Sequence, residues 1–149
     1  MSTQAHALPG TDAAAVSRPR DGLLRGALRV DALASAGSGI AYLVAAGPIG
    51  DLLGLPAGFL RVVGAFSVLY AAFAWFTASR QRVPLGTSRF IAVGNLVWFA
   101  ASIALVLAGW HSPTTTGSVW IVLQGLLVAG FADAQLLGVR RASGDSVRA

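Results

Sequence analysis

The sequence predicts an all-α fold, a bundle of four transmembrane helices that run up-down-up-down with both termini in the cytoplasm. Of its 149 residues, 55% are hydrophobic and only 11% are charged, whereas a soluble domain of this size usually carries about 25% charged residues. The charges are also clustered, because four apolar blocks are almost free of them and arginines lie between the blocks. A soluble bundle would need a charged outer face on every helix, so this pattern is typical of a membrane protein.

The four apolar blocks cover about residues 28–49, 59–78, 90–110 and 118–139. Each is close to the ~20 residues that cross ~30 Å of hydrocarbon at about 1.5 Å per residue. Within lipid, a helix satisfies the backbone hydrogen bonds of a single segment, so each block is predicted to be a transmembrane helix. The connections between the blocks are short, which makes sequential helices antiparallel neighbours.

The domain organisation follows from these blocks. Residues 1–24 are rich in small residues and proline and lack apolar periodicity, which predicts a disordered N-terminal tail without a signal peptide. Residues 25–141 form one four-helix transmembrane domain, and residues 142–149 form a C-terminal tail.

The arginines predict the orientation. The chain has eleven basic residues, all of them arginine, which indicates a GC-rich bacterial genome. Only Arg61 falls on one side of the predicted membrane. The other ten fall on the opposite side, which the positive-inside rule makes cytoplasmic, and they are Arg18, Arg20, Arg25, Arg29, Arg80, Arg82, Arg89, Arg140, Arg141 and Arg148. The chain is therefore expected to be a multi-pass protein of the inner (cytoplasmic) membrane.

Five polar residues within the apolar blocks are candidates for an intramembrane polar site: Asp133, Asn95, Asp31, Gln135 and Gln124. At about 100° per residue, Gln124 and Gln135 share one face of their helix and Asp133 points to the opposite face. Hydrogen bonds between membrane helices contribute on the order of 0.6 kcal/mol each, so the amides are interpreted mainly as contacts between helices.

The aspartates are different, because a carboxylate at the bilayer centre costs roughly 2.5–3.5 kcal/mol. Asp31 is expected one turn inside its helix. A carboxylate near a helix N-terminus is favoured, so a capping or topological role for Asp31 is considered at least equal to a functional role. Asp133 is expected to face the bundle interior, with Gln135 solvated at the interface. Asn95 and Arg89 are its nearest predicted partners, and both a structural and a functional role stay open.

Several functional classes are excluded or disfavoured. Cysteine is absent and the two histidines, His6 and His111, are far apart, so no metal site and no cofactor are predicted. The basic residues flank apolar blocks instead of forming a stripe with interleaved aromatics, so no nucleic-acid partner is expected. No nucleophile–base pair or glycine-rich phosphate loop is evident, and the chain is not expected to be an enzyme.

Four stretches carry a resemblance to a known group: LRVDALASAGSGIAYL, LLGLPAGFLRVVGAFSVLYAAFAWF, VGNLVWFAASIALVLAGW and VLQGLLVAGFADAQLLGVRR. Over about residues 27–141 the chain resembles small four-helix bacterial integral membrane proteins that have no assigned activity. An acidic residue, often glutamate, stands in that group where this chain has Asp133. The resemblance implies the four-helix architecture and nothing about chemistry.

Two functions are therefore considered. The first is a noncatalytic membrane component that lies in the lipid bilayer and associates through its helices with itself, as a homo-oligomer, or with another membrane protein. The alternative is a small transporter or ligand-binding bundle that uses Asp133, with Asp31 and Asn95, as an intramembrane acidic site. Polar faces that converge on one cavity would favour the alternative, and diverging faces would favour partner surfaces.

Overall fold

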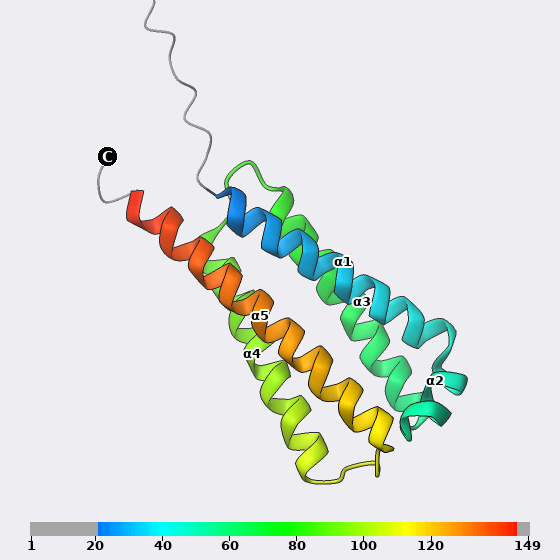
Figure 1. Ribbon diagram of the computed structural model, residues 1–149. Helices are drawn as coiled ribbons and strands as arrows, with labels where there is room; N and C mark the ends of the chain where they lie inside the picture. Colours follow the sequence, from blue (N-terminus) through cyan, green and yellow to red (C-terminus); the bar gives the residue numbers. More distant parts are fainter. Residues whose placement is uncertain (1–20, 146–149) are drawn as a thin grey trace, which may run out of the picture.

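The computed structural model describes residues 21–145, and within this range every regular element is a helix (Figure 1). The helices are α1 (Gly22–Val44), α2 (Ala46–Leu53), α3 (Ala57–Ser79), α4 (Leu85–Leu107) and α5 (Thr115–Asp145). All except α2 are long and apolar enough to cross a membrane, so the chain is a multi-pass membrane protein. The predicted all-α class and the four spanning helices are confirmed.

The first helix starts earlier and the last helix ends later than the sequence predicts. Residues 22–24, expected in the tail, form the first turn of α1, and α5 continues to Asp145. The guanidinium of Arg25 explains the early start, because it pairs with Asp21 and donates to the backbone carbonyls of Ala78, Arg80 and Gln81. With these partners Arg25 is accommodated inside the helix. Residues 1–20, which are predicted to be disordered, and residues 146–149 of the predicted C-terminal tail lie outside the described residues.

The predicted helix over residues 28–49 is divided in two. Pro48 lacks an amide hydrogen, and its ring clashes with the carbonyl four positions earlier, which belongs to Val44. The helix α1 therefore ends at Val44, and the chain turns at Ala45 into the short helix α2. Gly54 ends α2 with a left-handed conformation (φ 70°), which glycine adopts without steric cost.

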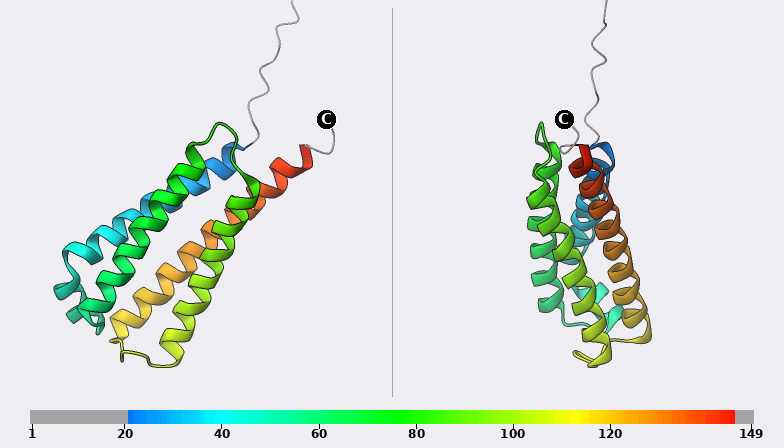
Figure 2. Two further views of the ribbon diagram at one scale, coloured as in Figure 1. Left: turned by 180° about the vertical axis from the view of Figure 1, so that it is seen from behind. Right: turned by 90° about the vertical axis from the view of Figure 1, so that its left-hand side faces the viewer.

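The long helices pack mainly as two pairs, α1 with α3 and α4 with α5. The two pairs are joined through α1 and α5, whereas α3 and α4 make few contacts (Figure 2). Within the first pair the backbones approach closely at Gly39 and Gly64. A Cβ atom added to either glycine would lie 2.8 Å from the carbonyl oxygen of the other. Small residues at such a crossing let membrane helices approach each other.

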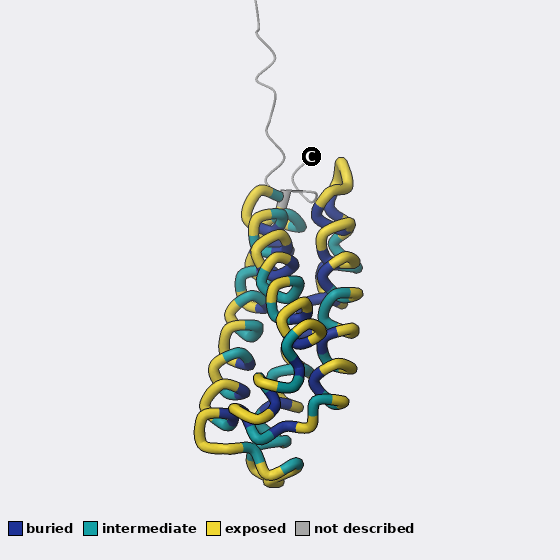
Figure 3. The backbone as a smooth tube through the Cα atoms, turned by 90° about the vertical axis from the view of Figure 1, so that its right-hand side faces the viewer, coloured by how far each residue is buried: buried dark blue, intermediate teal, exposed yellow. Residues whose placement is uncertain are grey.

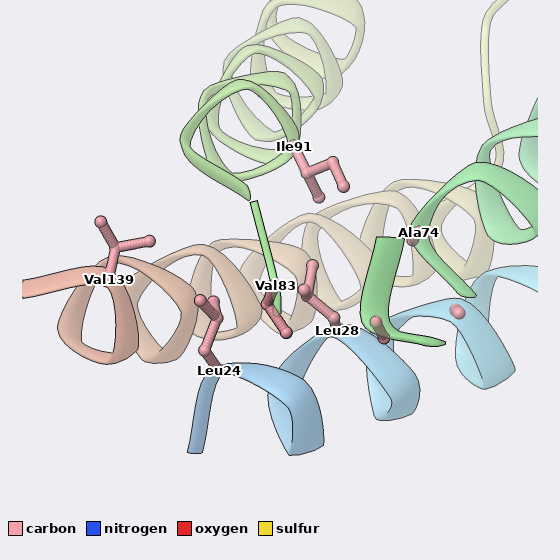
Figure 4. Packing of buried hydrophobic residues seen from close by; sticks show 8 residues of the cluster. Leu24, Leu28, Ala74, Val83, Ile91 and Val139 are labelled. Carbon is pink, nitrogen blue, oxygen red and sulfur yellow. The ribbon is translucent and has the colours of Figure 1, made fainter. Parts of the chain in front are cut away.

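The buried apolar residues form two clusters. The first, shown in Figure 4, combines all four long helices and the α3–α4 loop, and it comprises Leu24, Leu28, Ala32, Ala74, Ala78, Val83, Ile91 and Val139. The second involves α2 and its neighbours, and it comprises Tyr42, Ala46, Leu53, Leu55, Leu60 and Ile121. Figure 3 shows that the outer faces of the helices are largely exposed. These faces carry large apolar side chains such as Phe76 and Leu69, as expected for a surface in contact with lipid.

Candidate intramembrane polar site

Asp31 lies at the centre of a polar cluster to which all four long helices contribute. Its Oδ2 atom accepts hydrogen bonds from Asn95 Nδ2 (2.8 Å) and Gln135 Nε2 (2.8 Å) and lies within hydrogen-bonding distance of Tyr70 Oη (2.6 Å). Its Oδ1 atom accepts a longer bond from Ser35 Oγ (3.4 Å), one turn further along α1. The side chain of Asp31 is fully buried. We call these five residues the Asp31 cluster.

The depth of Asp31 differs from the prediction. Asp31 is nine positions after Gly22, which is about 14 Å along the helix axis at about 1.5 Å per residue. Asn95 is ten positions after Leu85, so both residues lie near the middle of their helices. The expectation that Asp31 sits one turn inside its helix was wrong, because α1 begins at Gly22 and not near residue 28. A capping role for Asp31 is therefore ruled out.

The assignment of Asp133 and Gln135 was reversed. The two side chains do point to opposite sides of α5, but Asp133 is exposed on the outer surface and Gln135 is fully buried against Asp31. The sequence placed Gln135 close to the interface because the helix was expected to end near residue 139. Since α5 continues for ten positions after Gln135, this amide remains inside the bundle.

Arg89 does not pair with Asp133. Among the residues that the structure describes, the ion pair present joins Arg25 to Asp21, with 2.8 Å between Nη2 and Oδ2. Arg89 lies on the exposed side of α4. The predicted topology determinants Arg29, Arg80, Arg82, Arg140 and Arg141 are likewise exposed.

A cavity of about 510 Å³ adjoins the Asp31 cluster, and we call it the central cavity. Three cluster members, Ser35, Tyr70 and Asn95, line it and also hydrogen-bond to Asp31 or to one another. Gln124 lines it from α5, half-buried on the same face of the helix as Gln135. The candidates Asp31, Asn95, Gln135 and Gln124 are thus brought to one region, and Asp133 is not.

The remaining wall of the central cavity is mainly apolar, with several aromatic side chains, and Ser38, Tyr42 and Ser67 add hydroxyl groups to it. Trp98 stacks on Phe66 with 5.6 Å between the ring centroids, and Phe73, Phe90 and Phe131 also line the cavity. Phe90 is 72% exposed although it lines the cavity, and the same holds for Leu69 on α3. The cavity therefore reaches the outer surface between α3 and α4, where the two helices make few contacts.

A second cavity of about 490 Å³ continues toward the α4–α5 loop. It shares Tyr42, Trp98, Ala101 and Gln124 with the central cavity, and its other lining residues are apolar or aromatic except Ser102. Tyr42 accepts a hydrogen bond of 2.7 Å from Trp120 Nε1, which joins α1 to α5 at this level. Two adjoining cavities thus run along the inside of the bundle.

The sequence reading missed Tyr70 and Ser35 as members of the site. Tyr70 is the only tyrosine in the second apolar block, and a buried tyrosine hydroxyl usually has a hydrogen-bond partner. This feature of the sequence could have identified Tyr70.

One atom of the Asp31 cluster is unsatisfied: Gln135 Oε1 is buried without a hydrogen-bond partner in the described part of the chain.

The chemistry of this site is that of one carboxyl group among neutral donors. Within residues 21–145, no group of three or more histidine, cysteine or acidic side chains could hold a metal ion. Of these neutral donors, Ser35, Tyr70 and Asn95 line the central cavity and can form hydrogen bonds with a molecule there. The resemblance to small four-helix bacterial membrane proteins stays a prediction, because no protein-family model, no curated protein and no solved structure matches the chain.

Proposed function

We propose that this protein binds a small, largely apolar molecule in the central cavity, as a ligand-binding or transport bundle. One observation carries the proposal: polar side chains from α1, α3, α4 and α5 converge on Asp31 beside that cavity. Diverging polar faces would instead have favoured a protein whose polar residues serve partner surfaces. The role is one of binding, without catalysis.

The lining of the cavity defines the class of ligand. A volume of about 510 Å³ falls in the range of about 300–1,000 Å³ that is usual for small-molecule sites. The aromatic wall favours an aromatic or branched aliphatic body, and Tyr70, Asn95 and Gln124 supply a few hydrogen-bonding groups. Entry between α3 and α4 suits a molecule that partitions into the bilayer.

We further propose the up-down-up-down order with both termini cytoplasmic, in the inner membrane of a bacterium. The excess of arginines at one set of helix ends supports it. Two contacts support the pairing of these ends: Arg25 on α1 reaches the carbonyls that follow α3, and Gly138 on α5 packs against Leu24 on α1.

A glycine on the cavity wall gives the experiment. Gly94 lines the central cavity and has no atom within 4 Å of an added Cβ, so Gly94→Leu would place its side chain in the cavity at low cost to the fold. Gly130→Leu is the matched control, because Gly130 is also a helical glycine with open space around it and lines neither cavity.

Binding of 2-naphthol to the purified chain would be measured by calorimetry and by quenching of tryptophan fluorescence. We expect Gly94→Leu to weaken binding about tenfold or more, equivalent to about 1.4 kcal/mol, and Gly130→Leu to bind as the parent does. Small molecules that co-purify from native membranes would be identified by mass spectrometry and compared between the two variants. Equal binding and equal co-purification in both variants would contradict the proposal.

Association with another membrane helix is a second candidate, and Asp133 favours it. An exposed carboxylate within a helix that contacts lipid is costly unless a donor or cation from another chain reaches it. The partner would be a second copy or another membrane protein. If this candidate holds, Asp133→Asn lowers the yield of any protein that co-purifies in mild detergent, and an unchanged yield removes it.

A further inference from the structure

Asp31, Tyr70 and Asn95 form a closed ring of three short contacts. Tyr70 Oη lies 2.6 Å from Asp31 Oδ2 and 2.8 Å from Asn95 Oδ1. The ring closes through Asn95 Nδ2, which lies 2.8 Å from Asp31 Oδ2. Each distance is that of a well-formed hydrogen bond, so we assign one hydrogen atom to each contact.

The hydrogens available in the ring can be counted. The Tyr70 hydroxyl supplies one, and the Asn95 amide supplies one through its nitrogen and none through its oxygen. An ionised carboxylate only accepts and supplies none. With Asp31 ionised, three contacts would therefore share two hydrogens, and two oxygen atoms would face each other without one.

The count is the same for either orientation of the Asn95 amide. With Asn95 turned by about 180°, its nitrogen would donate to Tyr70 and Tyr70 would donate to Asp31, while Asn95 Oδ1 would face Asp31 Oδ2. One contact again lacks a hydrogen. The missing hydrogen is supplied when the Asp31 carboxyl carries a proton, which it then donates within the ring.

The charged side chains on the helices around Asp31 are either engaged with other groups or exposed. On α1, Arg25 is engaged with Asp21 and with carbonyl groups, and Arg29 is exposed with its guanidinium 5.9 Å from the ring centroid of Trp75. From α3 the titratable group that faces Asp31 is Tyr70, and from α4 and α5 the amides of Asn95 and Gln135 face it. The charged residues of the spanning parts of α4 and α5 are all exposed, namely Arg89, Asp133, Arg140 and Arg141. A buried carboxylate without a cation in contact would carry a large desolvation cost.

We infer that Asp31 is a proton-binding site inside the membrane domain, with the proton shared in a ring with Tyr70 and Asn95. When the proton leaves, Tyr70 turns its hydrogen toward Asp31 and the oxygen atoms of Tyr70 and Asn95 repel each other. Asn95 Oδ1 is then free to accept from an N–H or O–H group in the central cavity. This last step, which rests on the proposed function, makes the proton and a hydrogen-bond-donating ligand compete.

Infrared spectroscopy tests the proton site without any ligand. All six acidic residues of the chain are aspartates, so the C=O band of protonated carboxylic side chains reports on aspartate alone. The full chain in liposomes near neutral pH should show this band, and Asp133→Asn should keep it. Asp31→Asn should lose it. A parent without the band, or an Asp31→Asn variant that keeps it, would overturn the inference.

Tyr70→Phe provides a second variant in case Asp31→Asn does not fold. It removes two of the three contacts, and the remaining bond from Asn95 needs no proton on Asp31. The variant, shown to be helical by circular dichroism, should lose or shift the carboxylic band. An unchanged band would contradict the ring. These infrared measurements use no ligand. If 2-naphthol does not bind, the proposed function fails, but the infrared result still decides whether Asp31 holds a proton.

Discussion

Gln135 Nε2 donates a hydrogen bond of 2.8 Å to Asp31 Oδ2, which joins the last long helix to the first. Both residues are fully buried, and the same Asp31 oxygen also forms hydrogen-bonding contacts with Tyr70 on α3 and Asn95 on α4. One carboxyl oxygen therefore connects the two helix pairs, which otherwise meet mainly along α1 and α5. The stability of the bundle should depend on which of these donors is removed.

Asn95→Leu should destabilise the bundle more than Gln135→Leu. Asn95 both donates to Asp31 and contacts the Tyr70 hydroxyl, and its loss leaves that hydroxyl with one partner, at a cost of about 1–2 kcal/mol. Gln135→Leu removes one donor from Asp31 but also removes the unsatisfied Oε1 atom, so the cost should stay below about 1 kcal/mol. Thermal unfolding in detergent measures both variants, and the reverse ranking would argue against the cluster.

Gly39→Ala should destabilise the bundle, whereas Gly37→Ala should not. A Cβ at Gly39 would lie 2.8 Å from the Gly64 carbonyl oxygen, so α1 and α3 must move apart at a cost of about 1–3 kcal/mol. A Cβ at Gly37 meets no atom within 4 Å, and alanine there should be neutral or gain up to about 1 kcal/mol. Unfolding midpoints of the two variants decide this, and equal midpoints would mean that the crossing is looser than described.

Thr114→Ala should lower stability by about 1 kcal/mol through the start of α5. Thr114 Oγ1 accepts from the Gly117 amide (3.0 Å) and donates to the Leu52 carbonyl (2.9 Å), so it caps α5 and ties it to α2. Thr116→Ala serves as the control in the same turn, because Thr116 is exposed. Unfolding midpoints that fall equally in both variants would show that the cap contributes nothing specific.

The sequence predicted the spanning helices well, because each corresponds to a long apolar block whose length can be counted along the sequence. Helix ends were less accurate, since they depend on tertiary contacts such as that of Arg25 with the α3–α4 loop. These errors in the ends carried into the site. Asp31 was placed too near a helix end, and Gln135 was taken for an interfacial residue.

The angular positions of Asp133 and Gln135 on their helix were predicted correctly. The prediction of which helix face is buried was wrong. The opposition of Asp133 and Gln135 follows from helix periodicity alone. The choice between them requires the position of α5 against α1, which brings Gln135 to Asp31. Tyr70 was overlooked for a similar reason, because a tyrosine in an apolar block is consistent with either a buried hydrogen bond or an interfacial position.

Single cysteines should report the topology, because the chain contains no cysteine of its own. Thr115 and Gly86 are both exposed, and a Cβ at Gly86 meets no atom within 4 Å. With both termini cytoplasmic, an impermeant thiol reagent added to intact cells should label Thr115→Cys and spare Gly86→Cys. Lysed cells, in which both sites should react, provide the control. Labelling of Gly86→Cys alone in intact cells would reverse the proposed orientation.

Lysine substitutions at the two aspartates should have opposite consequences. Asp133 is exposed on α5, so Asp133→Lys should unfold within about 0.5 kcal/mol of the parent. At Asp31 an ammonium group would face the Asn95 and Gln135 amide donors in a buried site, with no acceptor in place of the carboxyl oxygens. Asp31→Lys should therefore fail to yield a folded monodisperse species in detergent chromatography. If Asp31→Lys folds and Asp133→Lys does not, Asp133 rather than Asp31 is the buried carboxyl, and the proposed cavity site loses its centre.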